Sequence, residues 1–227
     1  MSHAEQPTRP PSSGVNRYAY LRRDGTLDIV LGSLVAGIAA YLFQFLGGRV
    51  LGVVDFAPIG ALLTAHFLTF VIVLLPIEQF VIRRITLGSE GWVVPPRAIL
   101  LAGTTAAGAA VAVWLTADAY FEGNGAFVGF VVATVVLHFF FAVGRGYLAG
   151  YRRFREYGIA SGGASLLRLA LAVGIVAVVA RPTASEFAWA HVLGPLVIFA
   201  LRPFRRPDRR ATGSRGRLAA EEIAAVD

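Results

Sequence analysis

The residues that could do chemistry in this chain are few, and they lie in or beside long apolar runs. We take six as candidate substrate-binding residues: Arg49, Asp55, His66, Glu78, Gln79 and His138. An imidazole exchanges a proton near neutral pH, and a guanidinium binds phosphate through paired donors. Because polar groups are costly inside lipid, such side chains face protein or water and point to a functional site.

The two histidines are expected at a similar depth. His66 lies about 14 Å from the start of its apolar run at Ala57, and His138 about 18 Å from the start of its run at Ala126, at about 1.5 Å per residue. Together they could form a polar layer lining a midplane cavity, as binding groups do in transporters. Alternatively, each histidine is satisfied within the bundle. His191, nearer the end of its run, is a weaker candidate.

Glu78 and Asp55 also have structural interpretations. Glu78, followed by Gln79, falls at a membrane interface, where it could reach water or pair with an arginine such as Arg83 or Arg145. Asp55 stands just before an expected helix with a proline in its first turn, so it suits an N-cap that accepts backbone N–H groups.

Sequence motifs for catalysis are absent. The chain has no HExxH, GxSxG or Walker A pattern, and without cysteine it can form neither disulfides nor thiolate metal sites. We therefore predict no enzymatic activity, no metal site and no cofactor.

The elements that must position the candidate residues are membrane helices. The chain is 56% hydrophobic and 15% charged, whereas soluble domains are about 25% charged. We predict a disordered lead over residues 1–20 without a signal-peptide run, a six-helix transmembrane domain over 21–202 and a basic tail over 203–227. The expected spans are 27–46, 57–82, 98–115, 126–143, 164–180 and 187–201. The last two are short of roughly 20 residues, so a re-entrant helix pair is the alternative there.

The placement of arginines predicts the orientation. The chain has no lysine, and every arginine except Arg49 and Arg181 falls in segments on the same side as the N-terminus, Arg168 among them. We expect the chain in a bacterial inner (plasma) membrane, and the positive-inside rule then puts both termini on its cytoplasmic side. Topology thus explains the net charge of +7 better than nucleic-acid binding does.

Small residues at four-residue spacing are typical of helices that pack closely in lipid. The pairs are Gly32/Ala36, Gly103/Ala107 and Gly125/Gly129.

The first hairpin carries a motif that resembles a known family. Arg49-x-Leu51-Gly52-x-x-Asp55-Phe56 is similar to the R-x-L-G-x-x-[ED]-F signature of polysaccharide-biosynthesis flippases, the Wzx-like O-antigen transporters of the multidrug/oligosaccharidyl-lipid/polysaccharide exporter superfamily. Two usual residues, a proline and a glycine, are replaced. The segment 144–169 is similar to the family's cytoplasmic link into its fifth helix, and the resemblance covers about residues 21–202.

The resemblance implies an all-α membrane bundle that moves lipid-linked oligosaccharides by alternating access. Members of the family have two six-helix lobes around one cavity, and this chain has room for the N-terminal lobe only. A homo-oligomer or a partner lobe is therefore implied. By carry-over, Arg49 is the first choice for a headgroup contact; an ordinary interfacial arginine is the alternative.

Three functions follow from these observations. The first is a half-size flippase subunit in envelope polysaccharide biosynthesis or export. The second is a non-transporting membrane scaffold, or a truncated remnant, within a polysaccharide assembly system. The third is an integral-membrane enzyme that uses a midplane histidine or Glu78.

Overall fold

The computed structural model describes residues 25–89, 91–121 and 123–205, and within these ranges the only regular structure is helical. The prediction of an all-α chain is confirmed, whereas the predicted lead and most of the tail lie outside the described residues. The helices are α2 (Thr26–Thr69), a π-helical turn (Phe70–Leu74), α3 (Leu75–Thr86), α4 (Pro96–Leu115), α5 (Ala117–Tyr120), α6 (Ala126–Gly150), α7 (Phe154–Val178), α8 (Ala184–Leu193), a 3₁₀ turn (Gly194–Leu196) and α9 (Val197–Ala200).

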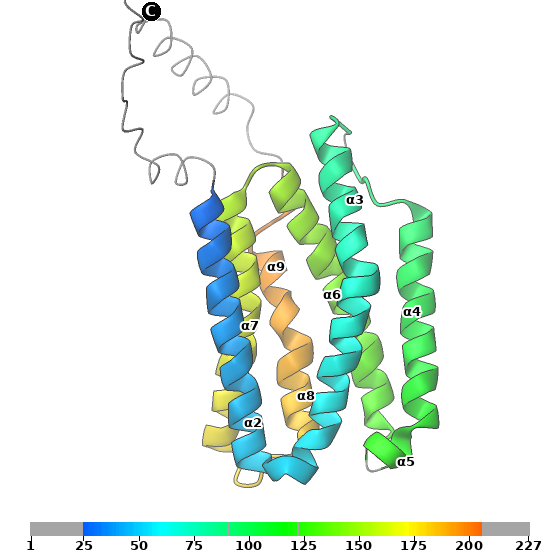
Figure 1. Cartoon of the computed structure of the whole chain (residues 1–227), viewed down its shortest axis with the longest axis vertical. Coiled ribbons are helices and arrows are strands. Elements are labelled where there is room, and N and C mark those ends of the chain that lie inside the picture. The colour runs from blue at the N-terminus through cyan, green and yellow to red at the C-terminus, as the bar shows by residue number, and fades with distance from the viewer. Residues whose placement is uncertain (1–24, 90, 122, 206–227) are drawn as a thin grey trace, which may run out of the picture.

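The chain reverses direction inside α2, at Gly52. This residue has φ 82° and ψ 170°, a conformation that essentially only glycine adopts. Figure 1 shows the first part of α2 running down one side of the bundle and the second part running back up into α3. Asp55 has helical backbone angles, so the N-cap prediction is wrong: the helix resumes directly after Gly52, and Asp55 lies in its first turn.

The described helices have the length and composition of membrane spans. Four helical stretches, 26–86, 96–115, 126–150 and 154–178, are long and apolar enough to cross a bilayer, and α8–α9 forms a shorter apolar stretch. Large apolar side chains also cover the outside of the bundle: Ile72, Leu100 and Trp114 are 68%, 67% and 69% exposed. A helix that is apolar on all sides is typical of a membrane span.

Two helices extend further than the apolar runs indicate. Helix α6 continues through Gly150 and α7 already begins at Phe154. A Cβ atom on Gly146 or Gly150 would lie 2.8 Å from a side-chain atom of α3, so these glycines let α6 pack directly on α3. Close packing here outweighs the low helix propensity of glycine. Consequently Arg145 and Arg168 lie inside helices, so counting Arg168 among the arginines outside the spans was wrong.

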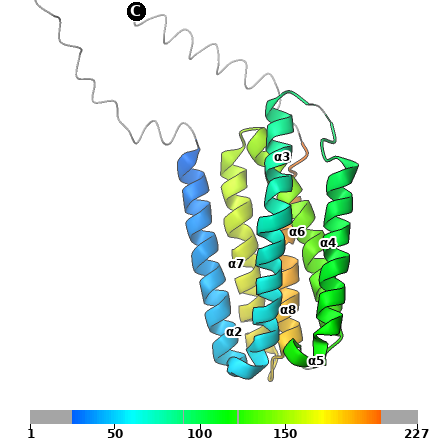
Figure 2. The ribbon, with the colours of Figure 1, turned by 45° about the vertical axis from the view of Figure 1, so that its right-hand side comes forward.

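Close helix contact is found at one of the three predicted small-residue pairs. On Gly32, a Cβ atom would lie 2.4 Å from the carbonyl oxygen of Gly158, so α2 and α7 touch backbone to backbone. Figure 2 shows these two helices side by side along their length. By contrast, a Cβ atom on Gly103, Gly125 or Gly129 would meet no described atom within 4 Å, so these pairs make no such contact within the described chain.

Candidate functional site: a buried histidine cluster

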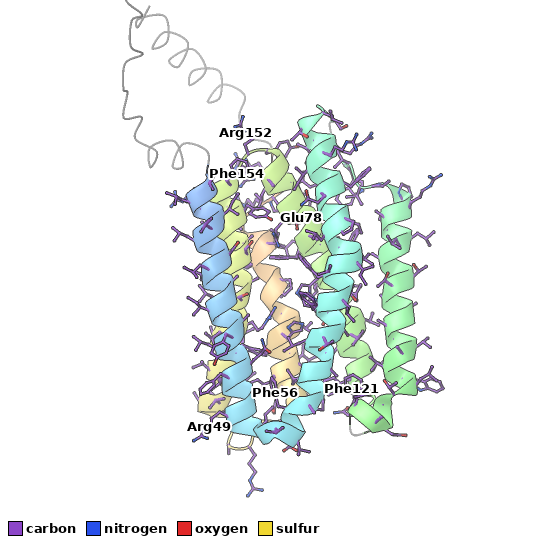
Figure 3. All side chains as sticks on the ribbon, in the orientation of Figure 1. Arg49, Phe56, Glu78, Phe121, Arg152 and Phe154 are labelled. Atoms are coloured by element: carbon purple, nitrogen blue, oxygen red, sulfur yellow. The ribbon has the colours of Figure 1, made fainter. Side chains whose placement is uncertain are left out.

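Four helices bring ionisable side chains together inside the bundle. His66 comes from α2, His138 from α6, Arg168 from α7 and His191 from α8, and α8 packs against the other three helices. Figure 3 labels Arg49 at one end of the bundle and Arg152 at the other, which we call the Arg49 end and the Arg152 end. Counted from the Arg49 end, the four residues lie about 10 to 21 Å along their helices at about 1.5 Å per residue.

The three imidazoles are in contact with one another. Ring centroids are 3.9 Å apart for His66 and His138, 5.1 Å for His66 and His191, and 5.6 Å for His138 and His191. One ring nitrogen of each residue lies within 4.8 Å of the other two. His138 is 4% exposed and His191 is fully buried, whereas His66 is partly exposed, so the cluster is buried except at His66.

Three of the six ring nitrogens in the cluster are buried without a hydrogen-bond partner among the described residues. Nδ1 of His138 lies 2.9 Å from the carbonyl oxygen of Thr134, and an N–H there donates to it. Nδ1 of His66 and both nitrogens of His191 are buried without a partner among the described residues. A buried polar atom left unpaired costs about 1–3 kcal/mol. Native proteins keep few such groups, and functional sites are one of the places where they occur.

Arg168 gives the cluster a positive charge. Its guanidinium carbon lies 5.7 Å from the ring centroid of Phe43, and its Nε is buried without a partner. The ion pairs among the described residues join Arg145 to Glu78 and Arg153 to Glu156, so no carboxylate in that part of the chain neutralises Arg168. A charge inside a membrane span is costly. An anion would therefore be attracted to this centre.

A small cavity opens beside the cluster. It measures about 10 Å³ and is lined by His66, Thr69, Thr134 and apolar neighbours from α2 and α6. That volume is about what one water molecule requires. In this conformation the cavity beside His66 has room for about one water molecule but not for a large headgroup.

Irregular backbone flanks two of the histidines. Four residues after His66 the helix widens into the π-helical turn, in which the N–H of Leu75 bonds to the carbonyl of Phe70. Pro76 follows, and it has no N–H with which to continue a regular helix. His191 lies just before the break at Gly194-Pro195. Isolated π-helical turns are frequent at functional sites.

Glu78 belongs to a separate polar cluster, with Arg145 and Tyr157. Its Oε1 accepts a hydrogen bond of 2.8 Å from the Tyr157 hydroxyl and lies 3.3 Å from Nη2 of Arg145. Arg145 also donates to the Tyr157 hydroxyl, and its guanidinium carbon lies 4.4 Å from the centroid of that ring. Glu78 is fully buried. Its predicted pairing with an arginine is confirmed, and the partner is Arg145 rather than Arg83.

The structure separates the remaining candidates from this centre. Arg49 and Asp55 are exposed at the Arg49 end, and Gln79 is exposed on α3. Of the six predicted residues, only His66 and His138 come together, in the shared layer that their depths predict. The sequence did not predict that three histidines would lie close enough together to bind a metal ion.

Two members of the cluster were underrated from the sequence. His191 was given less weight because it lies nearer the end of its apolar run. Arg168 was counted with the cytoplasmic arginines because it lies only four residues inside the expected span that begins at Ala164. With α7 beginning at Phe154, however, Arg168 lies about 21 Å along a helix of about 38 Å. Counting the depth of Arg168 from Phe154 instead of Ala164 places it near the middle of the helix.

In comparisons with known proteins, no family model, no curated protein and no solved structure matches this chain. The resemblance to polysaccharide flippases therefore rests on the sequence motifs alone.

Proposed function

We propose that this chain is a half-size, flippase-like membrane subunit that moves a lipid-linked oligosaccharide during envelope polysaccharide biosynthesis or export. The observation that supports a transport function most directly is the centre formed by Arg168 and the three histidines. It lies within the membrane-spanning part of the bundle, carries a charge without a described carboxylate partner, and contains unpaired polar atoms. Transporters place binding groups for charged substrates near the midplane.

The proposed topology has six crossings with both termini in the cytoplasm. The two arms of the helix that reverses at Gly52 form the first pair. Helices α4, α6 and α7 each cross once, and α8–α9 completes the bundle despite its break. The inner (plasma) membrane is the proposed location. In the proposed orientation, the arginines at the Arg152 end face the cytoplasm.

In the proposed mechanism, Arg168 binds the anionic headgroup and the histidines exchange protons or hydrogen bonds with it. A guanidinium matches phosphate oxygens with paired donors. Arg49 is exposed at the opposite end from Arg152, so it would meet the headgroup where the lipid enters or leaves the bundle. Asp55 and Gln79 are exposed outside the centre and would meet the substrate only at the surface of the bundle.

A single bundle offers one wall of a translocation pathway, so the proposal requires a second copy or a partner lobe. Stoichiometry in nanodiscs tests this requirement. We expect a dimer or a complex with a second membrane protein. A strict monomer that translocates nothing contradicts the proposed function.

Translocation in reconstituted vesicles tests the function itself. We expect the protein to accelerate exposure of a fluorescent polyprenyl-pyrophosphate oligosaccharide on the opposite leaflet. A neutral lipid with the same polyprenyl chain is the matched control, and it should not move because Arg168 would have no anion to bind. Equal rates for both lipids, or no rate above empty vesicles, would rule out the proposed selectivity.

The scaffold function is favoured by one observation. The cavity at the centre measures about 10 Å³, which is far too small for a sugar headgroup. A scaffold predicts that Arg49→Ala and His138→Ala leave glycan export unchanged in cells, whereas a bulky residue at Gly32 abolishes it by separating α2 from α7.

A further inference from the structure

We propose that His66, His138 and His191 form a binding site for a divalent transition-metal ion of the zinc type. The proposal goes beyond the proposed transport function and does not depend on it. Three imidazoles are the complete protein ligand set of one common class of zinc site, in which an exogenous ligand occupies the fourth position. Here one nitrogen of each residue lies within 4.8 Å of the other two.

The hydrogen bonds leave the ligand atoms available. The carbonyl of Thr134 accepts from Nδ1 of His138, which leaves Nε2 of that ring without a proton and free to bind a metal. A backbone carbonyl on the second nitrogen is the usual support of a metal-binding histidine. Neither nitrogen of His191 has a partner among the described residues, and neither does Nδ1 of His66. A metal ion would satisfy one nitrogen of each ring.

The three imidazoles need to move only a short distance towards one another to bind an ion. Around a tetrahedral ion with metal–nitrogen bonds of about 2.0–2.1 Å, the ligand nitrogens are about 3.3 Å apart. The described separations of up to 4.8 Å therefore need rotamer adjustments of the order of 1 Å. The π-helical turn after His66 and the break after His191 lie in the segments that would adjust.

The donor set selects the kind of ion. Three imidazoles without thiolate or carboxylate, among the described residues, suit zinc and its neighbours rather than magnesium or calcium. Arg168 adds a positive charge beside the site, since its Cβ lies 3.5 Å from the position that a Cβ atom on Gly194, three residues after His191, would occupy. The fourth ligand is therefore an anion, such as hydroxide or chloride, which offsets both the ion and the guanidinium.

The experiment is a zinc titration of the full chain in nanodiscs after chelator treatment. The chain has four histidines, and His3 is the one outside the cluster. The titration therefore uses a His3→Ala background, in which every histidine belongs to the proposed site. We expect one zinc ion per chain, and Co²⁺ in its place should give the visible absorption of a low-coordinate nitrogen site.

Variants decide whether the cluster is the site. On the His3→Ala background, His138→Ala or His191→Gln should weaken zinc binding by about 10–100-fold or more. Loss of a hydrogen bond that supports a ligand already costs about that much, and these variants remove a ligand. Arg168→Gln should tighten zinc binding, because a repelling charge is removed. Helical circular dichroism checks that each variant is folded.

Two results would overturn the proposal. One is a folded His3→Ala protein that takes up no zinc. The other is zinc or cobalt binding that the histidine substitutions leave unchanged, which would identify an adventitious ion only. Zinc binding without translocation would leave the site standing and refute the transport function, and translocation without zinc binding would do the reverse.

Discussion

Glu78 keeps a carboxylate inside the bundle because two helices supply donors to it. Tyr157 of α7 and Arg145 of α6 both reach its Oε1, while Oε2 is left unpaired. Removing one partner of a buried ion pair leaves an uncompensated charge, which is more damaging than removing both. The cluster thus ties α3, α6 and α7 together near the Arg152 end.

Arg145→Ala should therefore destabilise the protein by about 3–5 kcal/mol, because Glu78 would stay buried without its cation. The matched control is Gln79→Ala, next to Glu78 but exposed, which should change stability by less than about 0.5 kcal/mol. Unfolding in mixed micelles measures both. A double variant, Glu78→Gln with Arg145→Ala, should lose less than Arg145→Ala alone. A larger loss in the double variant would contradict the pairing.

At the scale of elements, helix contacts depend on a few glycines. The carbonyl oxygen of Asp28 lies 2.2 Å from the position that a Cβ atom on Gly158 would occupy, and backbone cannot move aside as a flexible side chain can. Overpacking of this kind costs about 1–3 kcal/mol and occasionally more.

Gly158→Ala should lower the melting temperature in detergent and separate α2 from α7. Gly129→Ala on α6 is the control, because a Cβ atom there meets no described atom within 4 Å and alanine favours helix. We expect the control to melt at or above the temperature of the unmodified chain. Equal losses in both variants would mean that the close approach of α2 and α7 does not stabilise the bundle.

The reversal at Gly52 makes a second prediction for an element. Gly52→Ala forces a side chain into a conformation that essentially only glycine adopts, at a cost of about 1–3 kcal/mol. Gly48→Ala, in regular helix four residues earlier, should be neutral or stabilising. Thermal unfolding of the pair distinguishes the two effects. Equal melting temperatures for the two variants would show that the reversal at position 52 tolerates a residue other than glycine.

The sequence was a good guide to the elements where apolar length carried the signal. The apolar run from Ala126 correctly predicted helix α6, and the depths of His66 and His138 correctly predicted that the two side chains would meet. It was a poor guide where packing overrode composition. The glycine-rich end of α6 and the polar start of α7 are helical because they fit against neighbours, and that fit is not visible in a single sequence. Arg168 was misplaced for this reason.

At the scale of the whole molecule, the proposed orientation can be tested by labelling. The chain has no cysteine, so single-cysteine variants need no background changes. Ser89→Cys, between α3 and α4, should react with an impermeant maleimide only in inside-out vesicles. Asn124→Cys, before α6, should react in intact spheroplasts. The reverse pattern would invert the positive-inside assignment.

In the proposed function, a charged centre inside the bundle acts on an anionic headgroup. The most direct measurement compares Arg168→Gln with Arg155→Gln in the vesicle translocation assay. Arg168 lies at the buried histidine cluster, whereas Arg155 is exposed in the first turn of the same helix. We predict at least a tenfold loss of initial rate for Arg168→Gln, about 1.4 kcal/mol in the barrier, and a rate close to that of the unmodified protein for Arg155→Gln. An unchanged rate for Arg168→Gln would contradict the account.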